Sequence, residues 1–277
     1  MYEWTRGRRM PPPEAEVKEH IKSLLVGLDH MHKNGIFHRD IKPENVLINE
    51  ETLKIADFGS CKGMYSKQPY TEYISTRWYR SPECLMTDGY YSFKMDLWGV
   101  GCVFFEILAL FPLFPGKNEM DQIHKIHNIL GTPSEAIQKS FQSKATHMEI
   151  QFPVKQGTGF EKMISHASPL AKDLISKLLK YSEHERYSTQ QALNHPYFGN
   201  PQSTLKFLPG LRSTRNASKK SVAFPPLRRK MMIPVIKKKF YSKKSLSYDD
   251  HGEKITVKKA PIWRSPSTKK YFFKSFY

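Results

Sequence analysis

Three side chains in a short polar stretch, HRDIKPEN at residues 38–45, could act together on a phosphoryl group. Asp40 carries a carboxylate that could accept or orient a hydroxyl proton, and Lys42 is long enough to reach the γ-phosphate of a nucleotide. Asn45 offers an amide oxygen to a divalent cation. Phosphoryl transfer needs an aligned acceptor hydroxyl, metal ions and a cation more than covalent chemistry. The stretch is therefore a candidate phosphoryl-transfer site.

A second carboxylate, Asp57, begins a DFG triplet twelve residues after Asn45. Two strand-like runs at 45–48 and 53–57 flank the polar residues 49–52, which predicts a hairpin that returns Asp57 towards Asn45. Magnesium prefers few carboxylates together with phosphate oxygens and water. HRD or DFG as an isolated triplet occurs by chance, but HRDIKPEN followed by DFG at this spacing is specific. We therefore expect Asn45 and Asp57 to act as metal ligands.

The segment between Asp57 and Glu83 contains Thr71 and Tyr73 in a TEY triplet. A phosphate on either hydroxyl would add nearly two negative charges. Arginines expected nearby could pair with such a phosphate and order the segment. They are Arg39, Arg77 and Arg80. The simpler alternative is a solvated loop that carries no modification.

The elements that must position these residues are mostly helical. Apolar residues recur at helical spacing over residues 14–33, and Asn34-Gly35 end the run just before the polar stretch. Further helical patterns cover residues 95–110, 120–130, 169–180 and 189–193. The sequence predicts a mainly α fold with one short β-hairpin.

Residues 97–114 form an apolar run that could be mistaken for a membrane span. The run is at the lower limit for crossing a bilayer, and it contains Glu106 and, near its end, Pro112. A helix that is apolar on all sides belongs at the centre of a domain. We expect a buried core helix and no membrane span.

The net charge of +18 is concentrated at one end of the 277 residues. Residues 1–198 hold 24 lysines and arginines against 23 acidic residues, whereas residues 199–277 hold 20 against 3. A segment so charged and so poor in apolar periodicity cannot offset its ordering entropy, so we expect a disordered basic tail. The tail could be a nuclear import signal, bind an acidic partner or nucleic acid, or have no specific role.

Three cysteines, Cys61, Cys84 and Cys102, are too few and too widely spaced for a disulfide framework or a zinc site. The first thirteen residues show no apolar signal sequence. A reducing compartment fits both observations. We expect the cytoplasm, with the nucleus or a cilium as alternatives.

Nine stretches of residues 1–198 together resemble the CMGC group of serine/threonine protein kinases. They are HRDIKPEN, DFG, TEY, TRWYRSPE, MDLWGVGC, PLFPG, LGTP, HERYS and ALNHPYF. The resemblance implies a kinase large lobe, ATP and Mg²⁺ as cofactors, proline-directed transfer to protein serine or threonine, and an upstream activating kinase.

The resemblance also implies residue roles, position by position. Asp40 looks like the catalytic base, Lys42 like the phosphate-contacting lysine, Asn45 and Asp57 like metal ligands, Thr71 and Tyr73 like activating phosphosites, Asp96 like the carboxylate that braces the catalytic loop, and Glu83 with Arg186 like a buried ion pair. Ser81 replaces the usual alanine of the APE motif, and we expect little effect from it.

One departure concerns what precedes the catalytic loop. Residues 1–39 contain no Gly-rich phosphate loop, no strand lysine and no helix glutamate, so the small lobe of a complete kinase is expected to be missing. We expect weak nucleotide binding and apolar residues left exposed near Val46, Leu47 and Ile55. A second hypothesis follows, in which the chain is a non-catalytic binding module that competes for the partners of a complete kinase.

Overall fold

The structure is a computed structural model that describes residues 1–49, 52–70, 76–146 and 152–199. All of them lie within one compact unit, Met1–Ser213. The predicted phosphosites Thr71 and Tyr73 and almost the whole basic tail lie outside the described residues.

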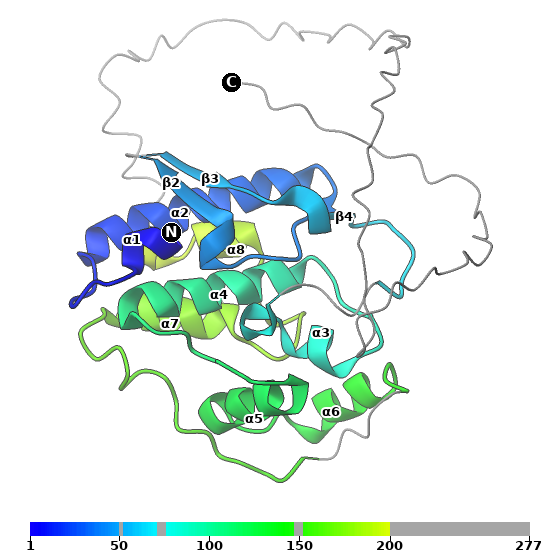
Figure 1. Ribbon diagram of the computed structural model, residues 1–277. Helices are drawn as coiled ribbons and strands as arrows, with labels where there is room; N and C mark the ends of the chain where they lie inside the picture. The colour runs from blue at the N-terminus through cyan, green and yellow to red at the C-terminus, as the bar shows by residue number, and fades with distance from the viewer. Residues whose placement is uncertain (50–51, 71–75, 147–151, 200–277) are drawn as a thin grey trace, which may run out of the picture. The chain divides into compact units, whose positions relative to one another are not determined.

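Most of the regular secondary structure in the described residues is helical (Figure 1). They are α1 (Tyr2–Thr5), α2 (Glu14–Lys33), α3 (Pro82–Met86), α4 (Lys94–Ala109), α5 (Glu119–Leu130), α6 (Glu135–Gln142), α7 (Pro169–Leu178) and α8 (Thr189–Leu193). The strands are β1 (Ile36–Phe37), β2 (Val46–Asn49), β3 (Thr52–Ile55) and β4 (Lys62–Gly63). The predicted mainly α fold with a short hairpin is confirmed.

Helix α2 covers the residues that its apolar period predicts. Its buried positions follow helical spacing and include Val17, Ile21, Leu24 and Leu28. Acidic residues lie in its first turn and basic ones in its last, where their charges interact favourably with the helix dipole. Gly35, at φ 74, lets the chain leave the helix and turn towards the polar loop.

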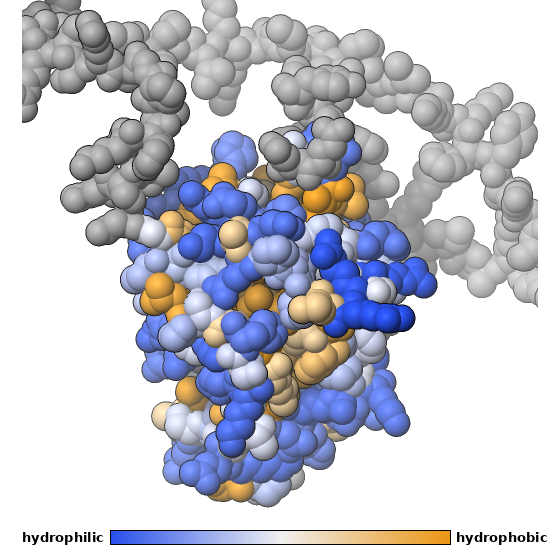
Figure 2. Space-filling view, turned by 90° about the vertical axis from the view of Figure 1, so that its left-hand side faces the viewer, coloured by the Kyte–Doolittle hydropathy of each residue, from blue (hydrophilic) through white to orange (hydrophobic). Residues whose placement is uncertain are grey.

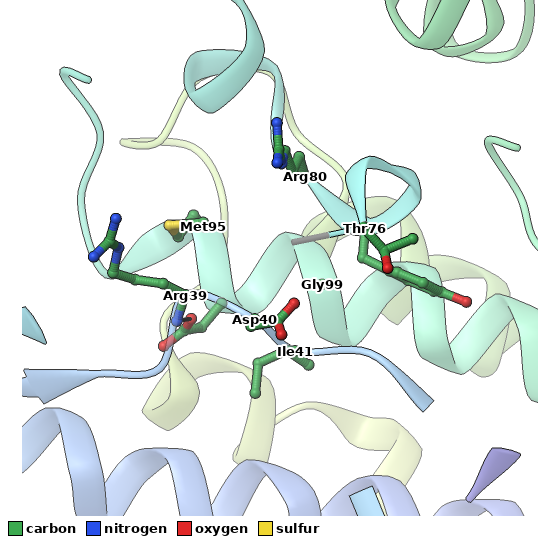
Figure 3. A pocket seen from close by; sticks show the side chains of 9 residues that line it. Arg39, Asp40, Ile41, Thr76, Arg80, Met95 and Gly99 are labelled. Carbon is green, nitrogen blue, oxygen red and sulfur yellow. Dashed lines mark hydrogen bonds between the residues drawn. The ribbon is translucent and has the colours of Figure 1, made fainter. Parts of the chain in front are cut away.

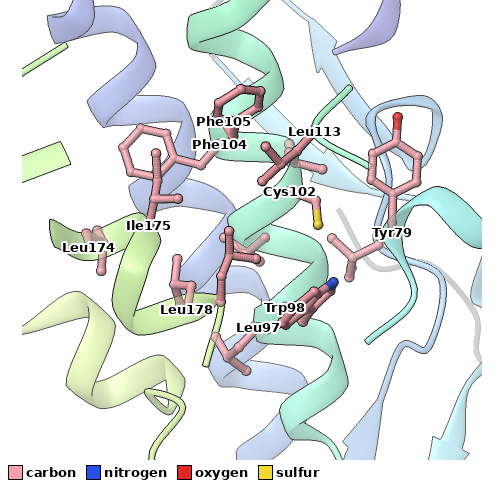
Figure 4. Close-up of a cluster of buried hydrophobic side chains, with 14 of the residues drawn as sticks. Tyr79, Leu97, Trp98, Cys102, Phe104, Phe105, Leu113, Leu174, Ile175 and Leu178 are labelled. Atoms are coloured by element: carbon pink, nitrogen blue, oxygen red, sulfur yellow. The ribbon is translucent and has the colours of Figure 1, made fainter. Parts of the chain in front are cut away.

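Helix α4 forms the centre of the core and packs against both α2 and α7. Nearly all its side chains are buried, and Figure 4 shows Trp98, Phe104 and Phe105 from this helix among the clustered apolar side chains. Trp98 stacks on Phe114 with ring centroids 5.7 Å apart. The run at 97–114 is thus a buried helix and its exit, as predicted. Within the described part of the chain, no helix is long and apolar enough to cross a membrane.

The strands form two antiparallel pairs. In the predicted hairpin, Val46 of β2 lies opposite Ile55 of β3. β3 ends at Ile55, so Asp57 lies beyond the strand rather than at its end. A second pair joins β1 to β4, with Phe37 opposite Lys62. The sequence did not indicate this pair, because two-residue strands are too short to show a period.

The prediction that Val46 would be exposed is wrong. Val46 is fully buried, whereas its neighbour Leu47 is 53% exposed and Ile55 is partly buried. Successive strand residues point to opposite faces, so Val46 and Leu47 lie on opposite faces of the hairpin and only one of these faces meets the core. The amino group of Met1, itself a buried residue, donates a hydrogen bond to the Val46 carbonyl and helps to cover this side of the hairpin.

Candidate active site

The loop after β1 joins Asp40, Lys42 and Asn45 directly. The Nζ atom of Lys42 lies 2.9 Å from Oδ2 of Asp40. The Nδ2 atom of Asn45 donates to the same oxygen at 2.9 Å and to the Asp40 carbonyl at 2.8 Å. Asp40 and Asn45 are buried. A cation and an amide therefore fix the orientation of the Asp40 carboxylate, and charge-assisted bonds of this kind are strong.

A carboxylate in the first turn of α4 holds the loop in place. Asp96 accepts the backbone N–H of His38 and that of Arg39, each at 2.8 Å. The Nε2 atom of His32, in the last turn of α2, lies 2.9 Å from Asp96 Oδ2. Arg39 has φ 74, which is unfavourable for a residue with a side chain. Three elements thus converge on Asp96, next to Asp40.

A glycine in α4 allows the helix to approach the loop closely. A Cβ atom at Gly99 would lie 2.9 Å from Ile41 Cβ and 3.0 Å from the Ile41 carbonyl oxygen. A small pocket opens here, lined by residues of the loop, of α4 and of residues 76–80. Figure 3 shows Asp40 beside this pocket, with Met95 and Gly99 on the adjacent helix. The close contact between Gly99 and Ile41 therefore brings the loop that carries Asp40 near to α4.

The hairpin returns the chain to the loop. The backbone N–H of Ala56 donates to the Asn45 carbonyl at 2.8 Å, and His38 Nε2 lies 2.9 Å from the Ala56 carbonyl oxygen. The next residue, Asp57, is exposed and has φ 63, and its side chain accepts the N–H of Gly59 at 3.4 Å. Ala56, bonded to both His38 and Asn45, ties the start of the DFG segment to the loop.

The donor set suits a magnesium ion shared with phosphate. Asn45 offers its amide oxygen and Asp57 an exposed carboxylate. Among the described residues, no group of three or more histidines, cysteines, aspartates or glutamates could hold a metal alone. Magnesium is commonly held by one or two protein oxygens together with substrate phosphates and water. Asn45 and Asp57 are therefore the residues that could hold it.

Of the three predicted phosphate-pairing arginines, Arg39 lies in the loop after β1 and the other two lie in residues 77–80, and each contacts different groups. Arg39 donates to the Ser60 carbonyl at 3.1 Å and to the Tyr91 hydroxyl at 2.7 Å. Arg77 donates to the Lys117 carbonyl at 3.2 Å. The buried Arg80 lies 3.4 Å from the Glu119 carboxylate. The phosphosites that they were predicted to serve lie outside the described residues.

Glu83 and Arg186, 103 positions apart in sequence, form a bidentate ion pair. The two N–O distances are 2.6 and 2.8 Å, and both side chains are almost fully buried. Arg186 also donates to the Lys180 carbonyl and lies over the Trp98 ring. The pair joins α3 to the loop between α7 and α8. Nearby, the buried Ser81 hydroxyl has no hydrogen-bond partner within the described chain.

Sequence reasoning missed two interactions at this site. One is the contact of His32 with Asp96; no local pattern marks a histidine in the last turn of α2. The other is the hydrogen bond that the Tyr79 hydroxyl donates to Oε2 of Glu106 at 2.8 Å. Burial raises the pKa of Glu106 to about 7; the Tyr79 hydrogen bond opposes this rise and the charge of Glu44 adds to it. The acidic residue inside the apolar run was the only signal.

A helical lobe whose loop and hairpin gather these groups defines a protein kinase domain. The family model for the protein kinase domain matches residues 2–198, and the chain belongs to that family.

Its curated relatives include the MAPK/MAK/MRK overlapping kinase. The human protein is 51% identical over 228 residues, which cover 82% of this chain and 54% of that relative. The mouse protein is 54% identical over 199 residues, covering 72% and 47%. The human serine/threonine-protein kinase MAK is 40% identical over 199 residues, covering 72% and 32%. The resemblance to the CMGC group is confirmed, and the chain spans about half the length of the first of these relatives.

Proposed function

We propose that this chain belongs to a protein-serine/threonine kinase, which transfers the γ-phosphoryl group of ATP to a serine or threonine hydroxyl of a protein. The observation that carries the proposal is the hydrogen-bonded unit of Asp40, Lys42 and Asn45. Residues 1–198 form its large lobe, and residues 199–277 form a separate basic tail.

We assign one role to each residue of the candidate site. Asp40 accepts or orients the proton of the substrate hydroxyl, because its carboxylate is held in one orientation. Lys42 contacts the transferred phosphate, and its 2.9 Å contact with Asp40 places its charge beside the acceptor. Asp96 accepts hydrogen bonds from the loop backbone and so positions Asp40. The ion pair of Glu83 and Arg186 keeps the lower part of the lobe in register.

ATP and Mg²⁺ are the cofactors that the family uses. In this chain, Asn45 and Asp57 would hold the metal, which supplies positive charge to the phosphates when bound. The hydrogen bonds that Nδ2 of Asn45 donates to the Asp40 carbonyl and carboxylate hold the Asn45 side chain against the loop. Asp57 is exposed, so its carboxylate is accessible to a ligand.

Phosphorylation of Thr71 and Tyr73 by an upstream kinase would activate the enzyme, with serine or threonine before proline as its target. Arg39 and Arg77 both donate to backbone carbonyls. A phosphate would be a stronger acceptor than a neutral carbonyl, because both partners are then charged. Together with Arg80, these residues would pair with the new phosphates and order the segment.

The test uses the full chain with Mg²⁺, ATP and a serine-proline peptide. We expect phosphate transfer that Asp40→Asn abolishes, and a nucleotide-dependent thermal shift that Asp57→Asn reduces. Asp121→Asn, which alters a carboxylate at the start of α5, is the matched control and should leave both signals unchanged. Absence of transfer and of the shift in the unmodified chain would refute the enzyme assignment.

A second candidate is a non-catalytic binding module that competes for the partners of a complete kinase. Exposed apolar side chains favour it: Val26 is 52%, Leu47 53% and Phe58 58% exposed. Figure 2 shows a face on which apolar surface lies among hydrophilic side chains. A contiguous exposed apolar patch commonly binds another protein, whereas single exposed apolar side chains do not require a partner. Binding of a partner that survives Asp40→Asn and is lost in Leu47→Ser would support this candidate, and loss of binding in Asp40→Asn would count against it.

The tail, residues 199–277, adds a further proposal based on its charge. An excess of seventeen positive charges, 20 basic against 3 acidic residues, favours an acidic protein or nucleic acid as its partner. Such a partner would fit a protein of the cytoplasm that also enters the nucleus or a cilium. Steeply salt-dependent binding of a nucleic acid by the full chain, lost on deletion of the tail, is the expected result. No binding at low salt would discard the proposal.

A further inference from the structure

Helix α1 and the turn that follows it carry three arginines within four positions. They are Arg6, Arg8 and Arg9, and all three are exposed. Over residues 1–198 basic and acidic residues are nearly equal in number, 24 against 23, so this group is a local concentration of charge. Figure 2 looks onto the side on which α1 lies in Figure 1, and it shows a compact group of strongly hydrophilic side chains there. The turn therefore presents a basic surface that is distinct in sequence from the basic tail.

Two aromatic side chains fix the direction of this charge. The central carbon of the Arg6 guanidinium lies 5.6 Å from the ring centroid of Tyr2, and that of Arg8 lies 5.0 Å from the centroid of Trp4. Arginine over an aromatic face at this distance gains cation–π attraction. The Nε atom of Arg8 also donates to the Trp4 carbonyl at 2.7 Å. Two of the three guanidinium groups are therefore held in place on the protein's own rings.

The backbone and the core hold these rings and arginines in turn. Gly7 has φ +74, a conformation that glycine adopts without strain, and it turns the chain at the end of α1. The N–H of Arg8 then donates to the Thr5 carbonyl at 3.2 Å. Trp4 packs against the core, and its ring centroid lies 4.7 Å from that of His20 in α2. Because these groups are already ordered, less conformational freedom is lost when a partner binds them.

The described neighbours oppose little of this charge. Glu3 lies 3.7 Å from Arg6, but the two side chains are 81% and 65% exposed. An exposed pair of this kind contributes little to stability, so a partner's carboxylate can take the place of Glu3. Arg8 and Arg9 have no ion-pair partner among the residues that the structure describes. Most of the positive charge of the turn is therefore accessible to an anionic ligand.

We propose that Arg6, Arg8 and Arg9, together with Tyr2 and Trp4, form a docking surface for an acidic segment of another protein. A guanidinium fork matches the two oxygens of a carboxylate, and such bidentate bonds are strong. Arginine, tyrosine and tryptophan are also enriched among the residues that dominate the energy of protein interfaces. The surface shares no residue with the candidate active site, and the inference does not depend on the proposed function.

The same contacts disfavour two other anionic partners. A single-stranded nucleic acid binds by stacking its bases on aromatic faces, and a guanidinium already lies over each of the two rings here. A membrane surface needs an apolar face that inserts beside the basic side chains. Within residues 1–13, Met10 is the one large apolar side chain that is more than half exposed. An acidic peptide satisfies the arginines without displacing a ring or burying an apolar face.

The test measures binding of a fluorescent glutamate-rich peptide to the full chain at about 0.15 M salt, where distant charges are screened. A triple variant with Arg6→Gln, Arg8→Gln and Arg9→Gln should bind the peptide about tenfold or more weakly. The matched control removes the same charge elsewhere on the unit and should change the affinity by about twofold or less. Its changes are Lys117→Gln, Lys144→Gln and Lys162→Gln, each at an exposed side chain. Both variants keep the basic tail, so its contribution to binding cancels in the comparison.

Tyr2→Leu tests the role of the rings, because it removes an aromatic face and keeps every charge. It should weaken peptide binding by about two- to fivefold, as expected for loss of a cation–π contact at an exposed site. Unchanged affinity in Tyr2→Leu, or equal affinity of the two triple variants, would overturn the inference. Oligothymidylate and phosphatidylserine vesicles are the comparison probes. A larger loss for either probe than for the peptide in the arginine variant would also overturn it.

Should the triple variant fail to fold, the single change Arg9→Gln decides, because it alters only an exposed side chain. Peptide binding should then weaken by about twofold or more, and an unchanged affinity would overturn the inference. Phosphate transfer plays no part in these measurements. A chain without kinase activity that binds the peptide through these arginines would therefore refute the proposed function and leave this inference standing.

Discussion

The carboxylate of Asp96 accepts the backbone N–H of Arg39 at 2.8 Å, which ties helix α4 to the residue before Asp40. Arg39 has φ 74, and such a conformation costs about 1–3 kcal/mol unless surrounding contacts hold it. The other Asp96 oxygen accepts the N–H of His38. The core helix thus stabilises an unfavourable backbone conformation at the point where the candidate catalytic residue begins.

Asp96→Asn should weaken this brace. The amide would place N–H groups where the carboxylate accepts N–H donors, leaving a buried donor unpaired at a cost of about 1–3 kcal/mol. Urea denaturation should show this loss, together with reduced phosphate transfer. Asp121→Asn, at a more exposed helix start, should change the free energy of unfolding by about 0.5 kcal/mol or less. Equal losses in the two variants would contradict the brace.

Gly99→Ala should destabilise the lobe although alanine favours helices. The added methyl group would lie 2.9 Å from Ile41 Cβ, and overpacking of this kind costs about 1–3 kcal/mol. The matched control is Gly27→Ala in α2, where the new atom meets only the flexible end of Ile55. That variant should be neutral or gain up to about 1 kcal/mol. Thermal unfolding of both variants measures the difference, and a gain in both would show that α4 can move away from the loop.

Arg186→Met should be among the most destabilising single changes. It leaves the Glu83 carboxylate buried without its bidentate partner, at a cost of about 3–5 kcal/mol. Adding Glu83→Gln removes the lone charge, so the double variant should recover part of the loss. A double-mutant cycle in urea gives the coupling energy.

An exposed ion pair is the control for that cycle. Lys139 and Glu135 contact each other with side chains 76% and 80% exposed, so Lys139→Ala should cost less than about 1 kcal/mol. A similar loss from both pairs, or purely additive effects of the Glu83 and Arg186 changes, would refute the special role of the buried pair.

Glu106 should make stability fall as pH rises towards neutrality. Burial raises its folded-state pKa from 4.5 to about 7, so the folded chain binds this proton more tightly than the unfolded chain. Its stabilising contribution is complete below pH 4.5 and is lost as pH rises to about 7, by at most about 1.4 kcal/mol per pH unit. Chemical denaturation across this range measures the decline.

Glu106→Gln should remove that decline while keeping an oxygen that accepts the Tyr79 hydroxyl. Tyr79→Phe should move the decline to higher pH, because the hydroxyl bond holds the pKa down. If the Gln variant shows the same dependence on pH as the unmodified chain, the buried carboxylate is not its source.

Local sequence predicted the elements whose causes are local. The apolar period of residues 14–33 gives α2, and two β-prone runs around a polar turn give the hairpin of β2 and β3. The HRDIKPEN stretch places Asp40, Lys42 and Asn45 within six residues, so their proximity required no long-range contact. The prediction for Val46 failed because the side of a strand that faces the core depends on what packs there.

By itself, the sequence determined the family, the mainly α fold and the short-range order of the candidate catalytic groups. The resemblance had already paired Glu83 with Arg186, but only the tertiary structure showed that His32 contacts Asp96 and that Tyr70 lies between Gly89 and Arg39. Spacing along the chain specifies contacts within one helix or hairpin. A contact between distant segments exists only once packing of the core brings them together, so local pattern alone does not identify its partners.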